Sequence, residues 1–313
     1  MADCLYAIKQ SLRNVGAGIY QPLSIRQELL NLYKTRSSRH GLGDFATLLL
    51  VMGVFRSAIQ HRRSLQEGFD SQPSSTENNP RHNPGSDPLP ETFPGTRKAM
   101  DYLQVLCWEN EEMPRLSSLR SAIQHHYHTI GILLGIPLGE LFCYSGYRVT
   151  SADISRCQNR LRNWVQQRGR EARQVAFHAG RLFGYIRHSN MRGYYECRAM
   201  MVACQSLWIY GEMAGLDPSL NSETAIDPNG QVSTSIIRLD QYLSREVERA
   251  WVQDGAGMRP YLAGVGCILG TDGVSRLIQE GSRVLCATRT WGFSAVMGKS
   301  LRLFHKTRSG ASL

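Results

Sequence analysis

Four histidines are the strongest candidates in this chain for a metal site or for acid–base catalysis. His125, His126 and His128 lie within four residues of one another, and His178 lies in a later helical pattern. Imidazoles can hold a metal ion, but a zinc site here would need a Cys or carboxylate beside them, and the neighbouring sequence supplies none. As a general base, His178 would need an orienting carboxylate and a nucleophile, and the sequence nominates neither. We therefore predict no metal-ligating, cofactor-binding or catalytic residue, and interpret these histidines as surface or helix-packing residues.

Other catalytic and metal-binding motifs are missing from the sequence. It contains no G-x-S-x-G elbow and no P-loop, and the glycines of residues 254–273 have the wrong spacing for a dinucleotide-binding loop. The most closely spaced cysteines, Cys197 and Cys204, lie too far apart for a zinc finger. These observations argue against an enzyme and against a zinc-finger DNA-binding unit within the chain.

Arginines are concentrated in one region. Residues 151–200 contain ten Arg and three acidic residues, which supply most of the net charge of +10. We regard non-specific nucleic-acid contact through this region as an open alternative, but ordinary solvated helix faces are the favoured interpretation. Arg181 is expected to lie away from the apolar Val175/Leu182 face, so that the basic side of this helix faces solvent or an acidic partner. The four arginines that could contact nucleic acid are Arg156, Arg160, Arg170 and Arg173.

The composition is typical of a globular protein. Of the 313 residues, 42% are hydrophobic and 20% are charged. The longest apolar runs, residues 45–55 and 129–142, are shorter than the roughly 20 residues that a membrane-spanning helix needs, so we predict no membrane association. We also predict free cysteine thiols, because the eight cysteines are scattered and no secretory signal opens the chain.

One segment divides the chain. Residues 64–96 hold six of the twelve prolines and are rich in Ser and Asn, without periodic apolar residues. Such a segment buries too little surface to offset its ordering entropy, so we predict a disordered insertion. It separates an N-terminal helical segment, residues 1–63, from the main helical body, residues 97–313.

The body is predicted to be a series of helices. Thr150 is expected to cap one of them, with Asp153 completing a capping box. The stretch ARQVAFHAGRLFGYIRH (172–188) places apolar residues at helical spacing, and residues 194–215 are apolar on nearly all sides, which indicates a central buried helix. We predict an all-α, multi-helix globular fold, with further helices over residues 97–112, 116–136, 236–252, 258–269, 272–286 and 291–306 and a loop over 221–233.

Several stretches in order resemble the C-terminal helical regulatory region of fungal transcription factors, especially those that carry two Cys2His2 zinc fingers at the N-terminus. These stretches are FATLLLVMGVFRSAI (45–59), HHYHTIGILLGIPLGELFCYSGYRVT (125–150), LRNWV (161–165), ARQVAFHAGRLFGYIR (172–187), YYECRAMMVACQSLWIY (194–210), IIRLDQYL (236–243), GAGMRPYLAGVGCIL (255–269), GVSRLIQEGSRVL (273–285) and TWGFSAVMGKSLRLF (290–304). The resemblance implies an all-α regulatory domain that controls activity or mediates protein contacts, and it brings no catalytic residues.

This resemblance implies a nuclear transcription regulator without enzymatic activity. It would act through regulatory proteins or an effector, and its DNA targeting would come from a zinc-finger unit that is missing from this chain or belongs to a partner. No cofactor is implied, and a homodimer is compatible with the sequence. The alternative is an all-α enzyme of secondary metabolism with a pocket near His178 or His125–His128.

Overall fold

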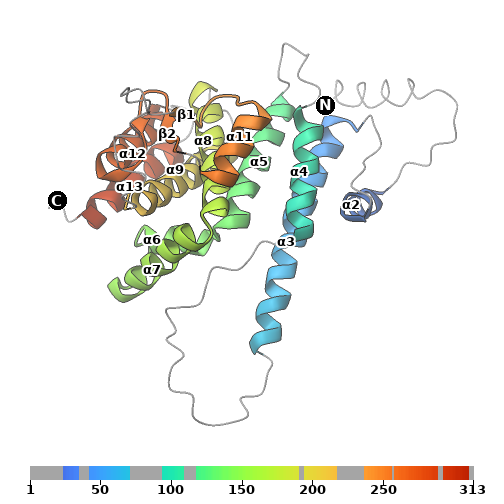
Figure 1. Cartoon of the computed structure of the whole chain (residues 1–313), viewed down its shortest axis with the longest axis horizontal. Helices are drawn as coiled ribbons and strands as arrows, with labels where there is room; N and C mark the ends of the chain where they lie inside the picture. Colours follow the sequence, from blue (N-terminus) through green and yellow to red (C-terminus); the bar gives the residue numbers. More distant parts are fainter. Residues whose placement is uncertain are drawn as a thin grey trace, which may run out of the picture.

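The computed structural model describes residues 24–34, 42–70, 94–108, 118–189, 194–216, 236–255, 257–287 and 292–309. Within these ranges the chain forms eleven helices and one small three-stranded sheet, which confirms the all-α prediction (Figure 1). The helices are α2 (Ile25–Lys34), α3 (Asp44–Asp70), α4 (Pro94–Trp108), α5 (Ser118–Gly135), α6 (Leu138–Tyr144), α7 (Ser151–Gln167), α8 (Gly169–His188), α9 (Tyr194–Ala214), α11 (Arg245–Asp254), α12 (Gly270–Ala287) and α13 (Gly292–Ser309). The strands are β1 (Ile236–Arg238), β2 (Arg259–Leu262) and β3 (Gly266–Cys267).

The larger hydrophobic core is built around α8 and α9. Helix α9 is buried along almost its whole length because it is apolar on nearly all sides, and it packs against α8, α5 and α12. Helix α8 contributes the predicted apolar face, and Leu182, Phe183 and Ile186 are fully buried. The predictions of a central α9 and of a core-facing α8 are both confirmed.

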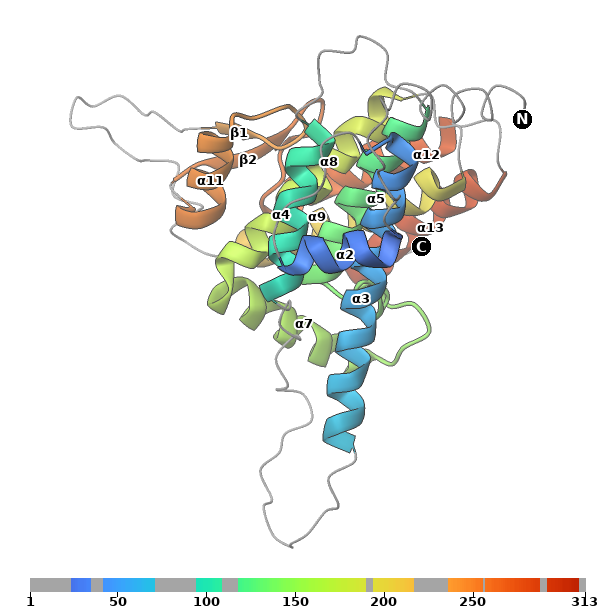
Figure 2. The same ribbon diagram turned by 90° about the vertical axis from the view of Figure 1, so that its right-hand side faces the viewer.

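A second, smaller core joins the N-terminal helices to the body. Leu50 and Val54 of α3 and Leu103 of α4 pack against Tyr127 and Ile130 of α5. Helix α5 contributes other residues to the larger core, so it belongs to both cores. Figure 2 shows α2, α3 and α4 gathered along the same side of α5.

Local signals in the sequence set several helix boundaries. The Thr150 hydroxyl accepts a hydrogen bond from the Asp153 amide at 3.2 Å, and the Asp153 carboxylate accepts one from the Thr150 amide at 3.0 Å. This capping box begins α7, as predicted. Pro137 is the N-cap residue of α6, so this helix begins at Leu138.

The predicted helix over residues 258–269 is wrong, and the one over 236–252 begins too early. Residues 259–267 form the β2–β3 hairpin, and residues 236–238 form β1, which pairs in parallel with β2. Between β2 and β3, the Leu262 carbonyl accepts a hydrogen bond from the Val265 amide at 3.2 Å, and Gly264 adopts a φ of 69°, which favours glycine. Pro260 and Leu262 are buried on alternate positions, as in a strand with one buried face.

The segment expected to be an insertion is only partly described. Helix α3 continues to Asp70 and α4 begins at Pro94, so both helices extend into the predicted range of 64–96. Residues 71–93, the predicted loop at 221–233 and the end of the helix predicted to reach residue 112 lie outside the described residues. The described cysteines are free thiols: Cys143, Cys157, Cys197, Cys204, Cys267 and Cys286. None of the helices in the described ranges has the length and apolar character needed to cross a membrane.

Candidate functional site

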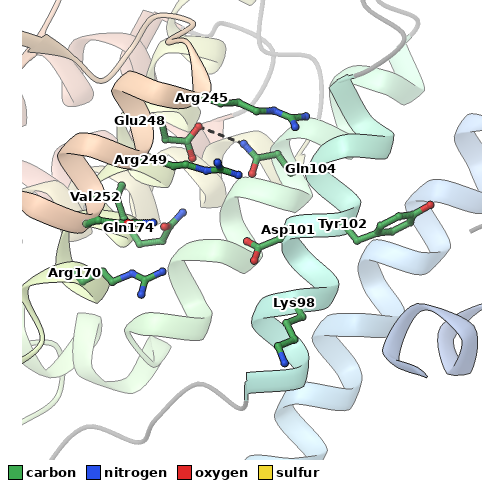
Figure 3. Close-up of a pocket in the computed structure, with 11 residues that line it drawn as sticks. Lys98, Asp101, Tyr102, Gln104, Arg170, Gln174, Arg245, Glu248, Arg249 and Val252 are labelled. Atoms are coloured by element: carbon green, nitrogen blue, oxygen red, sulfur yellow. Dashed lines mark hydrogen bonds between the residues drawn. The ribbon is translucent and has the colours of Figure 1, made fainter. Parts of the chain in front are cut away.

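A polar groove lies between α4, α8 and α11. Its cavity volume is about 640 Å³, within the usual range for small-molecule sites. Figure 3 shows Asp101 and Gln104 projecting from α4 toward the other two helices, and Arg245 and Arg249 extending from α11. Tyr102 instead points away from the groove. The groove is lined by Lys98, Asp101, Tyr102, Gln104, Arg170, Gln174, Arg245, Glu248, Arg249, Val252 and Gln253.

Helix α8 brings polar side chains to the groove in a regular order. Arg170, Gln174, His178 and Arg181 are spaced by four, four and three residues, so they follow one side of the helix. Arg170 and Gln174 line the groove itself, while His178 and Arg181 line two smaller cavities that adjoin it. The same helix therefore supports the core and presents a polar stripe.

Helix α11 is held against α8 by hydrogen bonds at its end. The Ser244 side chain accepts a hydrogen bond from the Val247 amide at the start of α11, and Gly255, with a φ of 63°, ends the helix. Arg173 of α8 donates to the carbonyls of Val252 and Gln253 at 3.1 and 3.0 Å, which satisfies carbonyl groups of the last turn. Arg173 therefore fixes the wall of the groove.

The groove carries an excess of positive charge. Lys98, Arg170, Arg245 and Arg249 are exposed cations of its lining, opposed by the carboxyls of Asp101 and Glu248. Glu248 accepts a hydrogen bond from Gln104 Nε2 at 3.4 Å (Figure 3). Desolvation raises the pKa of both carboxyls, although nearby arginines oppose the shift. The site therefore favours an anionic ligand.

Two of the predicted histidines meet beside the groove. Nδ1 of His128 and Nδ1 of His178 are 3.0 Å apart, and the ring of Tyr127 contacts both imidazoles edge-on. Burial lowers the pKa of His178 to about 4, with Arg181 acting in the same direction, and burial also holds the pKa of His128 well below its usual value. Both rings are therefore neutral at pH 7, and one donates to the other.

Arg181 is buried, which corrects the prediction that it lies on a solvated face. Only 6% of the residue is exposed. Its guanidinium lies 5.4 Å from the ring centroid of Tyr185 and 5.3 Å from that of Tyr242, and Nη2 donates to the Tyr185 hydroxyl at 3.3 Å. Tyr242 arrives from the segment after β1, which was predicted to be helical. We call His128, His178, Arg181, Tyr185 and Tyr242 the Arg181 cluster.

Two glycines of α8 allow the segment that follows β1 to lie close to this helix. A Cβ atom at Gly180 would lie 2.3 Å from Leu239 Cβ, and one at Gly184 would lie 2.6 Å from the Asp240 carbonyl oxygen. Neither contact is compatible with a side chain, because real Cβ atoms do not approach so closely. The two glycines therefore let the chain from β1 lie directly on α8 and cover Arg181 with Tyr242.

The remaining predicted histidines point elsewhere. His125 Nδ1 lies 3.5 Å from a carboxylate oxygen of Glu196 on α9, and His126 stacks on Tyr195 with ring centroids 5.2 Å apart. The three histidines of α5 thus contact two different helices: His125 and His126 contact α9, and His128 contacts α8. Among the described residues, no group of three or more His, Cys, Asp or Glu side chains could hold a metal ion.

The four arginines considered for nucleic-acid contact lie on two helices, α7 and α8, and have different surroundings. Arg156 forms an exposed ion pair with Asp153, and Arg160 binds Glu140 at 2.9 and 3.0 Å. Arg173 binds α11, and Arg170 lines the groove. Nucleic-acid contact through these residues stays a prediction.

The part of the site that comes from α11 and α4 was not predicted from the sequence. Arg245, Glu248 and Arg249 share one side of α11 at helical spacing, and this spacing was a readable signal. Their proximity to Asp101 and Gln104 joins residues more than 100 positions apart, and no pattern in one sequence reveals such a contact.

Comparisons with known proteins give one informative likeness. A curated protein of Gibberella fujikuroi, described as "Transcription factor", is 26% identical over 271 residues, which cover 87% of this chain and 30% of that protein. The chain therefore spans less than a third of the length of the relative that it matches. No model of a known protein family matches the chain, and no solved structure matches it. Neither the divided histidines nor this likeness supports the alternative of an all-α enzyme.

Proposed function

We propose that this chain is a regulatory module of a nuclear transcription factor, of the kind found in fungal transcription factors, and that it is not an enzyme. The observation that carries the proposal is the likeness to a curated transcription factor along 87% of the chain. The ordered series of helical stretches that resembles the fungal regulatory region agrees with it. In this proposal the module acts through protein or effector contacts, and a zinc-finger or partner unit provides DNA targeting.

The groove supports a regulatory function in a physical sense. Its walls come from α4, which belongs to the smaller core, and from α8 and α11, which pack in the larger one. A ligand that contacts all three helices would favour one relative arrangement of the two cores, because it binds that arrangement most tightly. Such a change is a means of altering the output of an attached DNA-binding unit.

A reporter experiment tests the proposal. The chain is fused to a heterologous DNA-binding domain and compared with the unfused chain on a reporter that carries the matching sites. We expect only the fusion to change reporter output. A fusion with Leu182→Asp is the matched control, because a charge at this fully buried position unfolds the core. Equal output from the intact fusion, the mutant fusion and the DNA-binding domain alone would refute a regulatory role.

A further inference from the structure

Arg181 is a buried charge that has no close ion pair among the described residues, although the carboxylate of Glu248 lines the same cavity and attracts it from a greater distance. No carboxylate oxygen lies within 4.0 Å of its guanidinium in the described part of the chain. Removing a charged group from water is costly unless an opposite charge and hydrogen bonds replace the water. Its only hydrogen bond there is to the Tyr185 hydroxyl, which uses one of its five N–H donors. A purely structural role of Arg181 would therefore leave most of its N–H donors without an acceptor among the described residues.

Arg181 lines a cavity of about 180 Å³. Phe177, Leu243 and Tyr242 give this cavity apolar walls, while Arg245 is a second cation of its lining and Glu248 contributes a carboxylate. The cavity shares Gln104, Arg245 and Glu248 with the larger groove, so the two spaces adjoin each other. A molecule in the groove would reach Arg181 by passing these shared side chains.

The geometry of Arg181 suits an oxyanion. A guanidinium is a planar fork whose N–H groups match the oxygens of a carboxylate or phosphate. The rings of Tyr185 and Tyr242 fix the position of the guanidinium, which reduces the entropy lost when a ligand binds. Further out, Lys98, Arg170 and Arg249 attract the same charge.

We infer that the cavity at Arg181 binds the oxyanion group of a small organic effector, a carboxylate or a phosphate, and that the larger groove holds the rest of the molecule. Arg181 binds the anion directly, and Arg245 assists at the entrance. Glu248, hydrogen-bonded to Gln104, is placed to accept a hydrogen bond from a hydroxyl of the effector. A small molecule fits better than an acidic protein segment, because Arg181 is only 6% exposed and lies under Tyr242.

Calorimetric titration of the purified full chain tests this site with two probes, benzoate and inorganic phosphate, at pH 7 and low ionic strength. We expect saturable binding of at least one probe with a Kd of about 1 mM, a typical affinity for a fragment of this size. Arg181→Met should weaken binding by at least ~10-fold, because the direct ionic contact is lost. Arg245→Glu should weaken it by roughly 5-fold or more through charge reversal at the entrance. Arg162→Glu makes the same charge reversal on an exposed position of α7 and should leave the Kd unchanged.

The outcomes separate the alternatives. Stronger binding of benzoate indicates a carboxylate effector, and stronger binding of phosphate indicates a phosphorylated one. Binding of neither probe, or an equal weakening by Arg162→Glu and Arg245→Glu, would overturn the inference. A hexaglutamate peptide that binds where both small anions fail would assign the surface to an acidic protein segment and also overturn it. If Arg181→Met does not fold, as judged by circular dichroism, the comparison of Arg245→Glu with Arg162→Glu decides.

That the bound anion is a regulatory effector rests on the proposed function. The anion site itself is tested separately, because the titration uses no DNA and no reporter. Anion binding without any reporter response from the fusion would keep this site and reject the regulatory role. A reporter response without anion binding would keep the regulatory role and reject this site.

Discussion

Two clusters of buried and partly buried polar groups each contain an arginine, and they differ in how the charge of that arginine is paired. Near the C-terminus, Glu212 of α9 accepts hydrogen bonds from the side chains of Tyr144, Trp208 and Arg308. We call these four residues the Glu212 cluster. Arg308 also donates to the Tyr144 carbonyl and lies 3.9 Å from the centroid of the Tyr144 ring. In the Arg181 cluster, by contrast, the arginine has aromatic neighbours and a hydroxyl but no carboxylate within 4.0 Å among the described residues.

The two clusters also differ in their place in the fold. Figure 1 shows α13, which carries Arg308, at the end of the molecule opposite to α4. The Glu212 cluster fastens this terminal helix to α6 and α9, whereas the Arg181 cluster lies beside an open groove. A satisfied network stabilises a fold, while an unsatisfied charge beside a cavity lowers stability unless a ligand completes it. Arg308 therefore belongs to a network of paired groups, whereas Arg181 is the residue for which we propose a binding role.

Arg308→Met is expected to have the largest effect. The substitution removes the counter-ion of Glu212 and the stacking on Tyr144, and leaves a partly buried carboxylate without its ionic partner. We expect the free energy of unfolding to fall by about 3 kcal/mol, at the lower end of values for broken buried pairs because Glu212 keeps some exposure. Urea unfolding followed by circular dichroism measures this loss. A loss equal to that of Arg181→Met would remove the distinction between the clusters.

Acidification is expected to destabilise the Arg181 cluster through His178. His178 has a pKa of about 4 in the folded chain, below the value of about 6.5 for an unfolded chain. The unfolded state therefore binds more protons between these two pH values, so stability falls as the pH decreases from 7 toward 4. His178 alone should account for a loss of about 2 kcal/mol at about pH 5, and His128 adds to it. Urea unfolding at pH 7 and at about pH 5 measures this loss. His178→Phe should make the free energy of unfolding less dependent on pH. An unchanged pH dependence in that variant would contradict the role of His178.

Tyr144→Phe is expected to give a smaller loss at the Glu212 cluster. It removes one hydroxyl donor to Glu212 but keeps the ring beneath Arg308 and the ion pair with Arg308. The free energy of unfolding should decrease by about 1 kcal/mol, the usual net contribution of one hydrogen bond. The same urea experiment measures it. A loss as large as that of Arg308→Met would mean that the hydroxyl, rather than the ion pair, holds the cluster together.

The sequence predicted the scaffold better than the site, and the reason is physical. The Thr150–Asp153 capping box and the apolar face of α8 are local patterns, so each could be recognised within a few residues. The β2–β3 hairpin was missed because its apolar residues also satisfy a helical spacing, and its turn depends on the positive φ of Gly264. Short apolar runs are ambiguous in this way.

Arg181 shows why the site itself could not be read from the sequence. Its position on α8 lies off the apolar face, and such an arginine is normally solvated. It is buried because the chain after β1, more than 50 residues later, lies on Gly180 and Gly184 and covers it. In the same way, the contact between His128 and His178 depends on the packing of α5 against α8. Both contacts belong to tertiary structure, which no local pattern encodes.

Arg181→Met is expected to have the smallest effect on stability in the absence of a ligand. Methionine keeps most of the side-chain volume between Tyr185 and Tyr242, and it replaces a charge that has no carboxylate partner within 4.0 Å in the described structure. We expect the free energy of unfolding to change by less than about 1 kcal/mol, or to rise, since the lost hydroxyl hydrogen bond and stacking are offset by the removal of a desolvated charge. Urea unfolding at pH 7, beside Arg308→Met, measures the difference. A loss as great as that of Arg308→Met would show that Arg181 is as necessary to the fold as Arg308. A buried arginine would then stabilise this protein without a carboxylate partner within 4.0 Å.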